Sequence, residues 1–208
     1  MRLYHFMKQE HGLNAIKTRK LRISRLTELN DPFELLSADL SSRPQRDALT
    51  NFKNQLANKN GLLCFCRSWH HPILWAHYAE SHAGLCLGFD IPDNLPTNVS
   101  YITSRLSWPD TIDESFVQRI LLTKFAHWSY EDEYRIYTRL DTEGDGNYFA
   151  NFDINLTLRQ VIVGAKSNLT RMDLSTVIGR LMNIEVFKAR AAFRTFRIVR
   201  NRDESLWT

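Results

Sequence analysis

The sequence predicts an α+β protein with a split or largely antiparallel sheet flanked by helices. Strand-like segments recur along the whole chain, while helix-like segments concentrate in its first two-thirds. The two kinds of segment do not alternate in the regular way that a parallel sheet with crossover helices requires. At 208 residues the chain is long for one domain and short for two. We expect a single domain, residues 1–208.

The first half opens with a strand and a short helix in which Leu13 and Ile16 have helical spacing. Pro32 favours extended geometry at the residue before it, which indicates an ordered loop. Gly61 suits the end of a long polar helix, and Pro72 suits the first turn of the next one. The expected elements are strands at 2–6, 21–24, 62–66 and 85–90, helices at 10–18, 43–60 and 72–82, and a loop at 29–34.

The second half is predicted to begin with a helix at 111–126. Clean alternation of residue types then indicates a strand at 133–140, and Gly144-Asp145-Gly146-Asn147 is typical of a hairpin turn. The remaining expected elements are strands near 148–153, 159–164, 185–190 and 195–200, with a helix near 170–182.

Composition excludes several classes of protein. Apolar residues make up 43% of the chain and charged residues 24%, which is ordinary for a globular protein. No apolar run approaches the roughly 18 residues that span a bilayer. Three cysteines, Cys64, Cys66 and Cys86, lie in strand-like segments without the second paired motif of a zinc site. We expect reduced thiols, no membrane partner and a cytoplasmic location.

The net charge of +4 is unevenly distributed. From Arg159 to Arg202 there are ten Lys or Arg residues against Asp173 and Glu185, so this segment carries +8 and the rest of the chain −4. A basic segment of this kind favours an anionic partner, such as nucleic acid or a phosphate-bearing ligand. A solvated basic face of the sheet is the alternative.

Three short segments carry residues suited to chemistry. The first is Tyr4-His5-Phe6, a histidine inside an otherwise apolar strand. Such a histidine is often buried and hydrogen-bonded for structural reasons. The return strand that contains Ser24 would nevertheless bring Tyr4, His5 and Ser24 into one neighbourhood.

The second segment runs from Trp75 to His82. On a continuous helix Trp75, Tyr78 and His82 share one face, and His77 points elsewhere. Such an aromatic stripe is either core or a planar wall on which a nucleobase or a nicotinamide ring stacks. The histidines of this region lack the paired spacing of a metalloprotease helix, so we expect no metal.

The third segment includes Glu131, Glu133 and Arg135, which alternation places on one side of a strand. An exposed salt-bridged face would contribute only about 0–1 kcal/mol per pair. Alternatively, a carboxylate beside a ribose would stabilise developing positive charge there.

Together these segments resemble an uncharacterised bacterial domain family. The similar segments are 3–6, 21–34 (including Asn30-Asp31-Pro32-Phe33-Glu34), 74–78, 84–90 and 130–135. A more distant resemblance, to the ADP-ribosyltransferase superfamily, implies that fold and a reaction with NAD. It implies that His5 binds the NAD ribose, that Tyr78 stacks on nicotinamide, and that Glu133 acts on the nicotinamide ribose through an oxocarbenium-like state.

The resulting hypothesis is an NAD-consuming ADP-ribosyltransferase-like enzyme of bacterial defence or toxin–antitoxin systems, with a nucleic-acid or protein acceptor. Its expected catalytic residues are Glu133 and Glu131. Its expected NAD-binding residues are Tyr4, His5, Ser24, Asn30, Asp31, Trp75, His77, Tyr78 and Arg135. Two alternatives are a non-catalytic nucleic-acid-binding or regulatory module that uses the basic C-terminal segment, and a metal-independent ribonuclease with His5 or His77 as acid and base.

Overall fold

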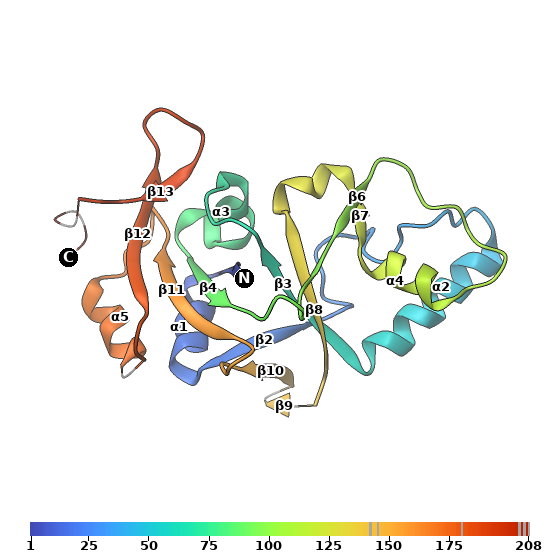
Figure 1. The fold of residues 1–208 in the computed structure, drawn as a ribbon, viewed down its shortest axis with the longest axis horizontal. Coiled ribbons are helices and arrows are strands. Elements are labelled where there is room, and N and C mark those ends of the chain that lie inside the picture. Colours follow the sequence, from blue (N-terminus) through green and yellow to red (C-terminus); the bar gives the residue numbers. More distant parts are fainter. Residues whose placement is uncertain (142, 145, 180, 204, 206, 208) are drawn as a thin grey trace. The chain divides into compact units, whose positions relative to one another are not determined.

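Backbone pairing in the computed structural model confirms the α+β class, with a mixed and mostly antiparallel sheet (Figure 1). The structure describes residues 1–141, 143–144, 146–179, 181–203, 205 and 207. Within these residues no helix has the length and apolar character that a bilayer crossing requires.

Internal contacts divide the chain into two compact units. The first unit contains Met1–Leu21, Phe65–Leu95 and Ala150–Thr208, and the second contains Arg22–Cys64 and Pro96–Phe149. The expectation of one domain over residues 1–208 stays a prediction.

The sheet of the first unit has the strand order β13–β12–β11–β4–β1 (Figure 1). Its strands are β1 (Arg2–Met7), β4 (Leu85–Asp90), β11 (Thr157–Val163), β12 (Glu185–Ala191) and β13 (Ile198–Arg200). The β11–β12 pair is parallel and the other pairs are antiparallel. At the far side of β1, Tyr4 pairs with Cys66 at the end of β3 (Asn60–Cys66).

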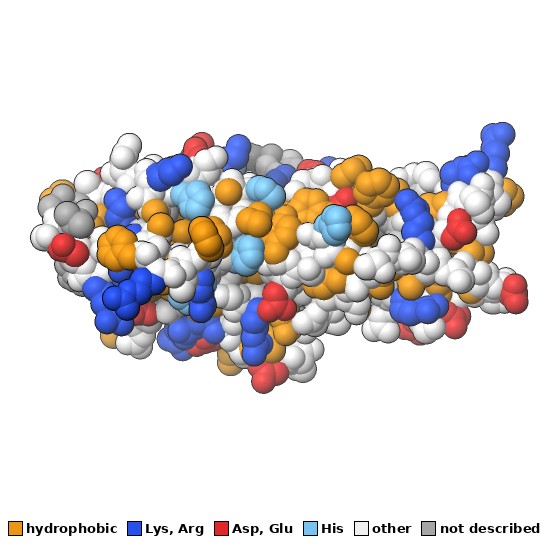
Figure 2. Space-filling model, turned by 90° about the horizontal axis from the view of Figure 1, so that it is seen from above, with side chains coloured by type: hydrophobic (Ala, Val, Ile, Leu, Met, Phe, Trp, Pro, Cys, Tyr) orange, Lys and Arg blue, Asp and Glu red, His pale blue; other side chains and the backbone are white. Residues whose placement is uncertain are grey.

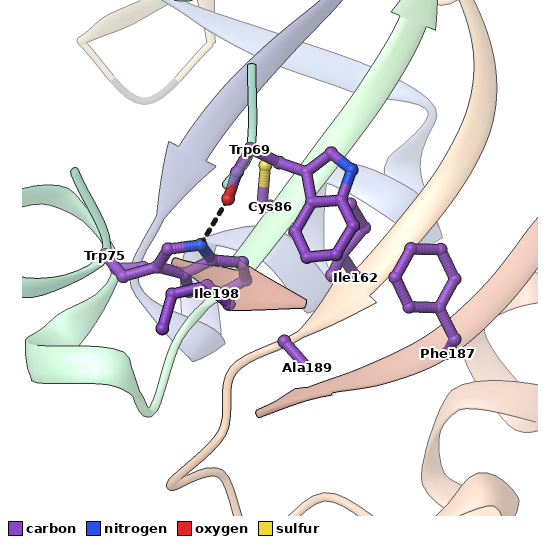
Figure 3. Packing of buried hydrophobic residues seen from close by; sticks show 8 residues of the cluster. Trp69, Trp75, Cys86, Ile162, Phe187, Ala189 and Ile198 are labelled. Carbon is purple, nitrogen blue, oxygen red and sulfur yellow. Dashed lines mark hydrogen bonds between the residues drawn. The ribbon is translucent and has the colours of Figure 1, made fainter. Parts of the chain in front are cut away.

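Helices cover both faces of this sheet. Helix α1 (Gln9–Thr18) packs on β4 and on α5 (Arg171–Ile178), and α3 (Pro72–Tyr78) packs on β1. A Cβ on Gly12 would lie 2.6 Å from the side chain of Leu85, so α1 approaches β4 closely. Because successive strand residues face opposite ways, Cys86 lies on the other face, in the core around Trp75 (Figure 3). Burial on both faces explains why β4 reads as an apolar run.

The second unit combines two helices, α2 (Arg43–Ala57) and α4 (Glu114–Leu121), with short strands. These strands and the 3-10 helix η2 are β2 (Lys20–Arg25), β5 (Thr97–Asn98), β6 (Ser100–Ile102), β7 (Thr123–Phe125), η2 (Ala126–Glu131), β8 (Glu133–Arg139), β9 (Glu143–Gly144) and β10 (Asn147–Asn151). Strand β3 pairs with β2 and β8, β5 pairs with β8, and β6 runs parallel to β7. The core of this unit contains Leu26, Leu35, Ala38, Leu49, Leu62, Phe116 and Ile120.

The predicted strands at 2–6, 21–24, 62–66, 85–90 and 133–140 are confirmed, and their ends move by no more than two residues. The hairpin at 144–147 is confirmed by pairing of Asn147 with Gly144, although Asp145 lies outside the described residues. Arg180 lies outside them too, and the helix expected near 170–182 ends at Ile178. The strand expected from 195 begins at Ile198.

Helix α2 ends before the position that the sequence indicated. It starts with a capping box between Ser42 and Gln45 and ends at Ala57. Gly61 belongs to β3 and is not a helix cap. A Cβ there would lie 2.5 Å from Ile23 and 2.7 Å from the Ser24 carbonyl oxygen, so the glycine is required by close strand packing.

The helix predicted at 72–82 is also shorter. Helix α3 stops at Tyr78, and Glu80, Ser81 and His82 follow with positive φ in the 3-10 turn η1 (Glu80–His82). The chain turns here to bring Gly84 onto β1, where a Cβ would meet the Met7 carbonyl oxygen at 2.3 Å. His82 therefore does not share a helical face with Trp75 and Tyr78, and that prediction is wrong.

The helix expected at 111–126 is too long at both ends. Asp113 caps α4 by accepting a hydrogen bond from the Phe116 amide at 2.8 Å, and β7 follows the helix at Thr123.

Candidate functional site

The residues expected to form one NAD site come from both units. Tyr4, His5, Trp75, His77 and Tyr78 belong to the first unit, and Ser24, Asn30, Asp31, Glu131, Glu133 and Arg135 belong to the second. We expect His5, Tyr78 and Glu133 to lie at one cleft. Because these residues belong to different units, this stays a prediction.

In the first unit, Tyr4 and His5 lie on opposite faces of β1. Tyr4 packs on the core that contains Trp75. His5 contacts the ring of Phe65 edge to face, with 5.7 Å between centroids. Adjacent strand residues alternate between faces, so Tyr4 and His5 cannot act on one ligand from this strand alone.

Trp75 is a core residue. Its side chain is fully buried, and its Nε1 donates a hydrogen bond of 2.7 Å to the Trp69 carbonyl oxygen (Figure 3). Phe6 packs against it edge to face at 5.1 Å. Tyr78, His77 and His82 keep exposed surface, and the rings of Tyr78 and His77 are 6.0 Å apart at an interplanar angle of 82°. Since both ring faces of a buried tryptophan are occupied by protein, the core alternative describes Trp75.

In the second unit, Ser24 sits in β2 opposite Leu62, and Asn30 is exposed. Asp31 is buried, and its Oδ1 accepts a hydrogen bond from the Phe33 amide at 2.9 Å. This Asx turn fixes the loop that precedes Glu34.

Glu133 and Arg135 belong to a buried set of five charged residues, which we call the charge cluster: Glu34, Lys124, Glu131, Glu133 and Arg135. Arg135 donates two hydrogen bonds to Glu133, at 2.9 and 3.1 Å, and two to Glu34, at 2.7 and 2.9 Å. Lys124 bridges Glu133, at 3.1 Å, and Glu131. Three carboxylates thus share two cations in a place largely shielded from water, since all five residues are at most 7% exposed.

These contacts set the protonation state of the cluster. Burial raises the pKa of Glu133, but the charges of Arg135 and Lys124 outweigh it, and the net pKa lies below the ordinary value. Burial lowers the pKa of Lys124, and the charges of Glu133 and Glu131 more than reverse this effect, so its pKa is raised. Burial also raises the pKa of the Cys64 thiol well above its ordinary value, and the charge of Glu133 adds to it. At neutral pH Glu133 is a carboxylate paired with two cations.

The expectation of an exposed salt-bridged strand face is wrong for Glu133 and Arg135, which are 4% and 1% exposed. Glu131 is the last residue of η2, separated from β8 by Asp132 alone, and reaches the cluster through Lys124. Both oxygens of Glu133 already accept hydrogen bonds from cations. A ribose hydroxyl would have to compete with Lys124 and Arg135 for them in a buried position. Sequence patterns gave no sign of Lys124 or Glu34, because the contacts that recruit them are non-local.

A second candidate site lies in the first unit, at the β12–β13 hairpin. The segment from 186 to 202 contains six Lys or Arg residues and no Asp or Glu. Ala192 and Arg197 close the hairpin with a backbone hydrogen bond of 2.9 Å, and Phe193 and Phe196 of its tip are 88% and 99% exposed. We call residues 186–202 the arginine hairpin. Figure 2 shows basic and hydrophobic side chains side by side over the part of the molecule where this hairpin lies, at the left.

A hollow of about 570 Å³ borders the arginine hairpin. Its lining residues are Trp69, His70, Arg190, Ala192, Phe193, Arg194, Thr195, Val199, Arg200 and Arg202. The Arg190 guanidinium stacks over Phe193 at 4.2 Å, and that of Arg200 over Phe187 at 4.9 Å. Arg194, Arg197 and Arg202 form no ion pair within the described chain. The basic character was visible in the sequence, but the expectation of a strand at 195–200 hid the exposure of Phe196.

No family model, curated protein or solved structure matches this chain. The resemblance to the bacterial domain family and to the ADP-ribosyltransferases therefore stays a prediction, as does NAD binding.

Proposed function

We propose that this protein binds single-stranded nucleic acid through the arginine hairpin. The observation that carries the proposal is the pair of almost fully exposed phenylalanines, Phe193 and Phe196, set among arginines beside a hollow. Exposing two large apolar rings at a hairpin tip is unfavourable in water, which indicates a partner that covers them. Proteins that bind single strands combine stacking rings with a basic groove in this way.

The chemistry of the cations supports a nucleic acid over other anions. Five of the six basic residues in the hairpin are arginines. A guanidinium is planar, stacks on rings and binds phosphate through two hydrogen bonds, whereas a lysine ammonium is a point charge. Single strands fit better than duplexes, because the bases of a duplex are already stacked on one another and offer no face to Phe193 or Phe196. An anionic membrane surface is the competing partner for such a tip.

Fluorescence anisotropy with a labelled single-stranded RNA of about 10 nucleotides tests the proposal. Binding is expected to weaken steeply between about 50 and 200 mM salt, because phosphate contacts release counterions. The double variant Arg194→Gln/Arg197→Gln should reduce the slope of log affinity against log salt by about 1.4, since each lost contact with a single strand is worth about 0.7. The matched control is Arg43→Gln/Arg139→Gln, which changes two exposed arginines of the second unit and should leave the slope intact.

Substitution of the two phenylalanines provides a second test of the proposal, independent of the arginine variants. Phe193→Ala/Phe196→Ala should weaken binding by about 1–3 kcal/mol per stacked base and leave the salt slope unchanged. Tighter binding to anionic phospholipid vesicles than to RNA would assign the hairpin to membranes. Equal affinity for duplex and single strand, or binding indifferent to salt, would contradict the proposal. Appearance of RNA fragments during the assay would favour the ribonuclease hypothesis, to be checked with His5→Ala and His77→Ala.

A further inference from the structure

Residues of the second unit line a cavity of about 250 Å³ that opens to solvent, and this cavity shares no residue with the arginine hairpin. Its base is the parallel pair β6–β7, which contributes Ile102 and the three residues Thr123, Lys124 and Phe125. The loop from Phe33 to Ser37 and the segment from Thr103 to Arg105 complete it. Backbone hydrogen bonds of 2.8 Å between Leu106 and Ser37, and between Asp39 and Leu106, tie these two segments together. The cavity therefore has ordered walls.

Most of the cavity wall is apolar. Leu36 and Ile102 contribute aliphatic surface, and Phe33 and Phe125 are 58% and 45% exposed. Two half-exposed rings beside one cavity are suited to a flat ligand, because aromatic rings contact one another favourably in offset or edge geometry. A dry cavity of about 150 Å³ already holds benzene. The volume here is sufficient for a single ring with small substituents.

Two polar side chains of the cavity wall are not available to such a ligand. The Ser37 hydroxyl oxygen has no hydrogen-bond partner among the described residues, but it has almost no accessible surface, so a molecule in the cavity does not reach it. Lys124 also lines the cavity, but its ammonium is committed to Glu131 and Glu133.

The available cation is Arg105. Its Nη1 donates to the carbonyl oxygens of Leu36 and Ala38, both at 3.0 Å, and its guanidinium lies over the Phe33 ring at 5.7 Å. These contacts hold the guanidinium at the rim of the cavity. Its Nε and Nη2 have no partner among the described side chains, and together they present one edge of the guanidinium fork. That edge matches a carboxylate.

We propose that this cavity binds a small cyclic carboxylate: one flat ring against Leu36, Ile102 and Phe125, and the carboxylate on Arg105. The site does not rest on the proposed nucleic-acid binding. Its two requirements, a ring and a negative charge, can be separated with simple probes.

The test compares para-hydroxybenzoate, its uncharged amide para-hydroxybenzamide, and acetate by ligand-observed NMR titration of the whole protein. Wild type is expected to bind the acid at least about tenfold more tightly than the amide, because a hydrogen bond to a charged group contributes more than one to a neutral group. Acetate, which lacks the ring, is expected to show no saturable binding.

Arg105→Gln should reduce the affinity for the acid to that for the amide and leave the amide unaffected. The matched control is Arg119→Gln, which removes a guanidinium that lies over Phe116 at the same 5.7 Å and does not line the cavity. Phe125→Ala removes one ring of the cavity wall and should weaken the binding of both ring probes. This second variant keeps the test decisive if Arg105→Gln loosens its loop. Equal affinity of wild type for acid and amide, or no saturable binding of either, would overturn the proposal.

Discussion

At the scale of single residues, the charge cluster shows how burial changes the role of a side chain. Arg135 holds two carboxylates by bidentate contacts and is 1% exposed. Arg139, on the same strand, pairs with Asp141 at 3.5 Å, and its side chain is 81% exposed. We expect Arg135→Met to lower the free energy of unfolding by about 3–5 kcal/mol, because it leaves buried carboxylates short of a cation.

The control Arg139→Met should change the free energy of unfolding by less than about 1 kcal/mol, as for other exposed pairs. Urea titrations followed by circular dichroism give both values. A loss below about 1 kcal/mol in Arg135→Met would mean that the cluster is open to water.

The ion pairs of Glu133 also allow a direct test of the NAD hypothesis. If Glu133 acts on the nicotinamide ribose, Glu133→Gln should abolish NAD turnover in a variant that still folds. If it is a structural ion-pair partner, Glu133→Gln should lower the melting temperature, and any NAD turnover should persist in the fraction that remains folded. Thermal melts and NAD turnover of one preparation distinguish these outcomes, and equal turnover by wild type and variant would remove Glu133 from the mechanism.

At the scale of elements, Gly61 could be either a helix C-cap or a strand residue in tight packing, and the sequence could not distinguish these two roles. A glycine after a polar helix is normally a C-cap, a position that also accepts asparagine. In β3 the same glycine faces Ile23 and Leu140, with no room for a Cβ. Gly61→Ala is therefore expected to destabilise the protein by about 1–3 kcal/mol, and Gly61→Asn by more, as measured by urea denaturation. Better tolerance of asparagine than of alanine would restore the helix-cap interpretation.

Local patterns predicted the elements whose causes are local. Alternation gave β8, an apolar run gave β4, and the Gly-Asp-Gly-Asn turn gave the β9–β10 hairpin. The ends of α3 and α4 were wrong because tertiary contacts decide them: Gly84 must reach the Met7 carbonyl oxygen, and the residues after α4 are recruited into β7. Prediction of the functional sites failed for the same reason. The cavity of the second unit is formed by three segments that are separate in the sequence, and no sequence pattern predicts that they lie together.

At the scale of the whole molecule, only some of the excess basic residues in the C-terminal part of the sequence are available to a binding partner. The +8 of residues 159–202 includes Arg171, which stacks on Trp207 at 4.5 Å, and Lys188, which donates to the Ser167 carbonyl oxygen. These cations serve the fold of the first unit. Within the arginine hairpin, Arg200 also pairs with Glu185, and the cations that remain for a partner include Arg194, Arg197 and Arg202. The proposed function therefore depends on a subset that composition alone could not identify.

The response of the molecule to acid follows from its carboxylates. In the first unit, the hydrogen bond from Arg2 lowers the pKa of Asp90, with Arg159 adding to it. In the second unit, Arg135 and Lys124 outweigh burial and lower the pKa of Glu133. A carboxyl group whose pKa is lower in the folded than in the unfolded state stabilises the fold above its unfolded pKa, and this contribution is lost as the pH falls. The melting temperature should therefore fall most steeply below about pH 4. A smaller loss is expected as the pH falls below about 6.5, because burial lowers the pKa of His82 and its protonation then favours the unfolded state.

Because Arg135→Met removes the main cation beside Glu133, the stability difference between wild type and this variant should shrink over the acid range in which Glu133 is protonated. Thermal melts of both proteins at constant ionic strength measure this, and a gap that widens on acidification would show that Glu133 is not held as a carboxylate by Arg135.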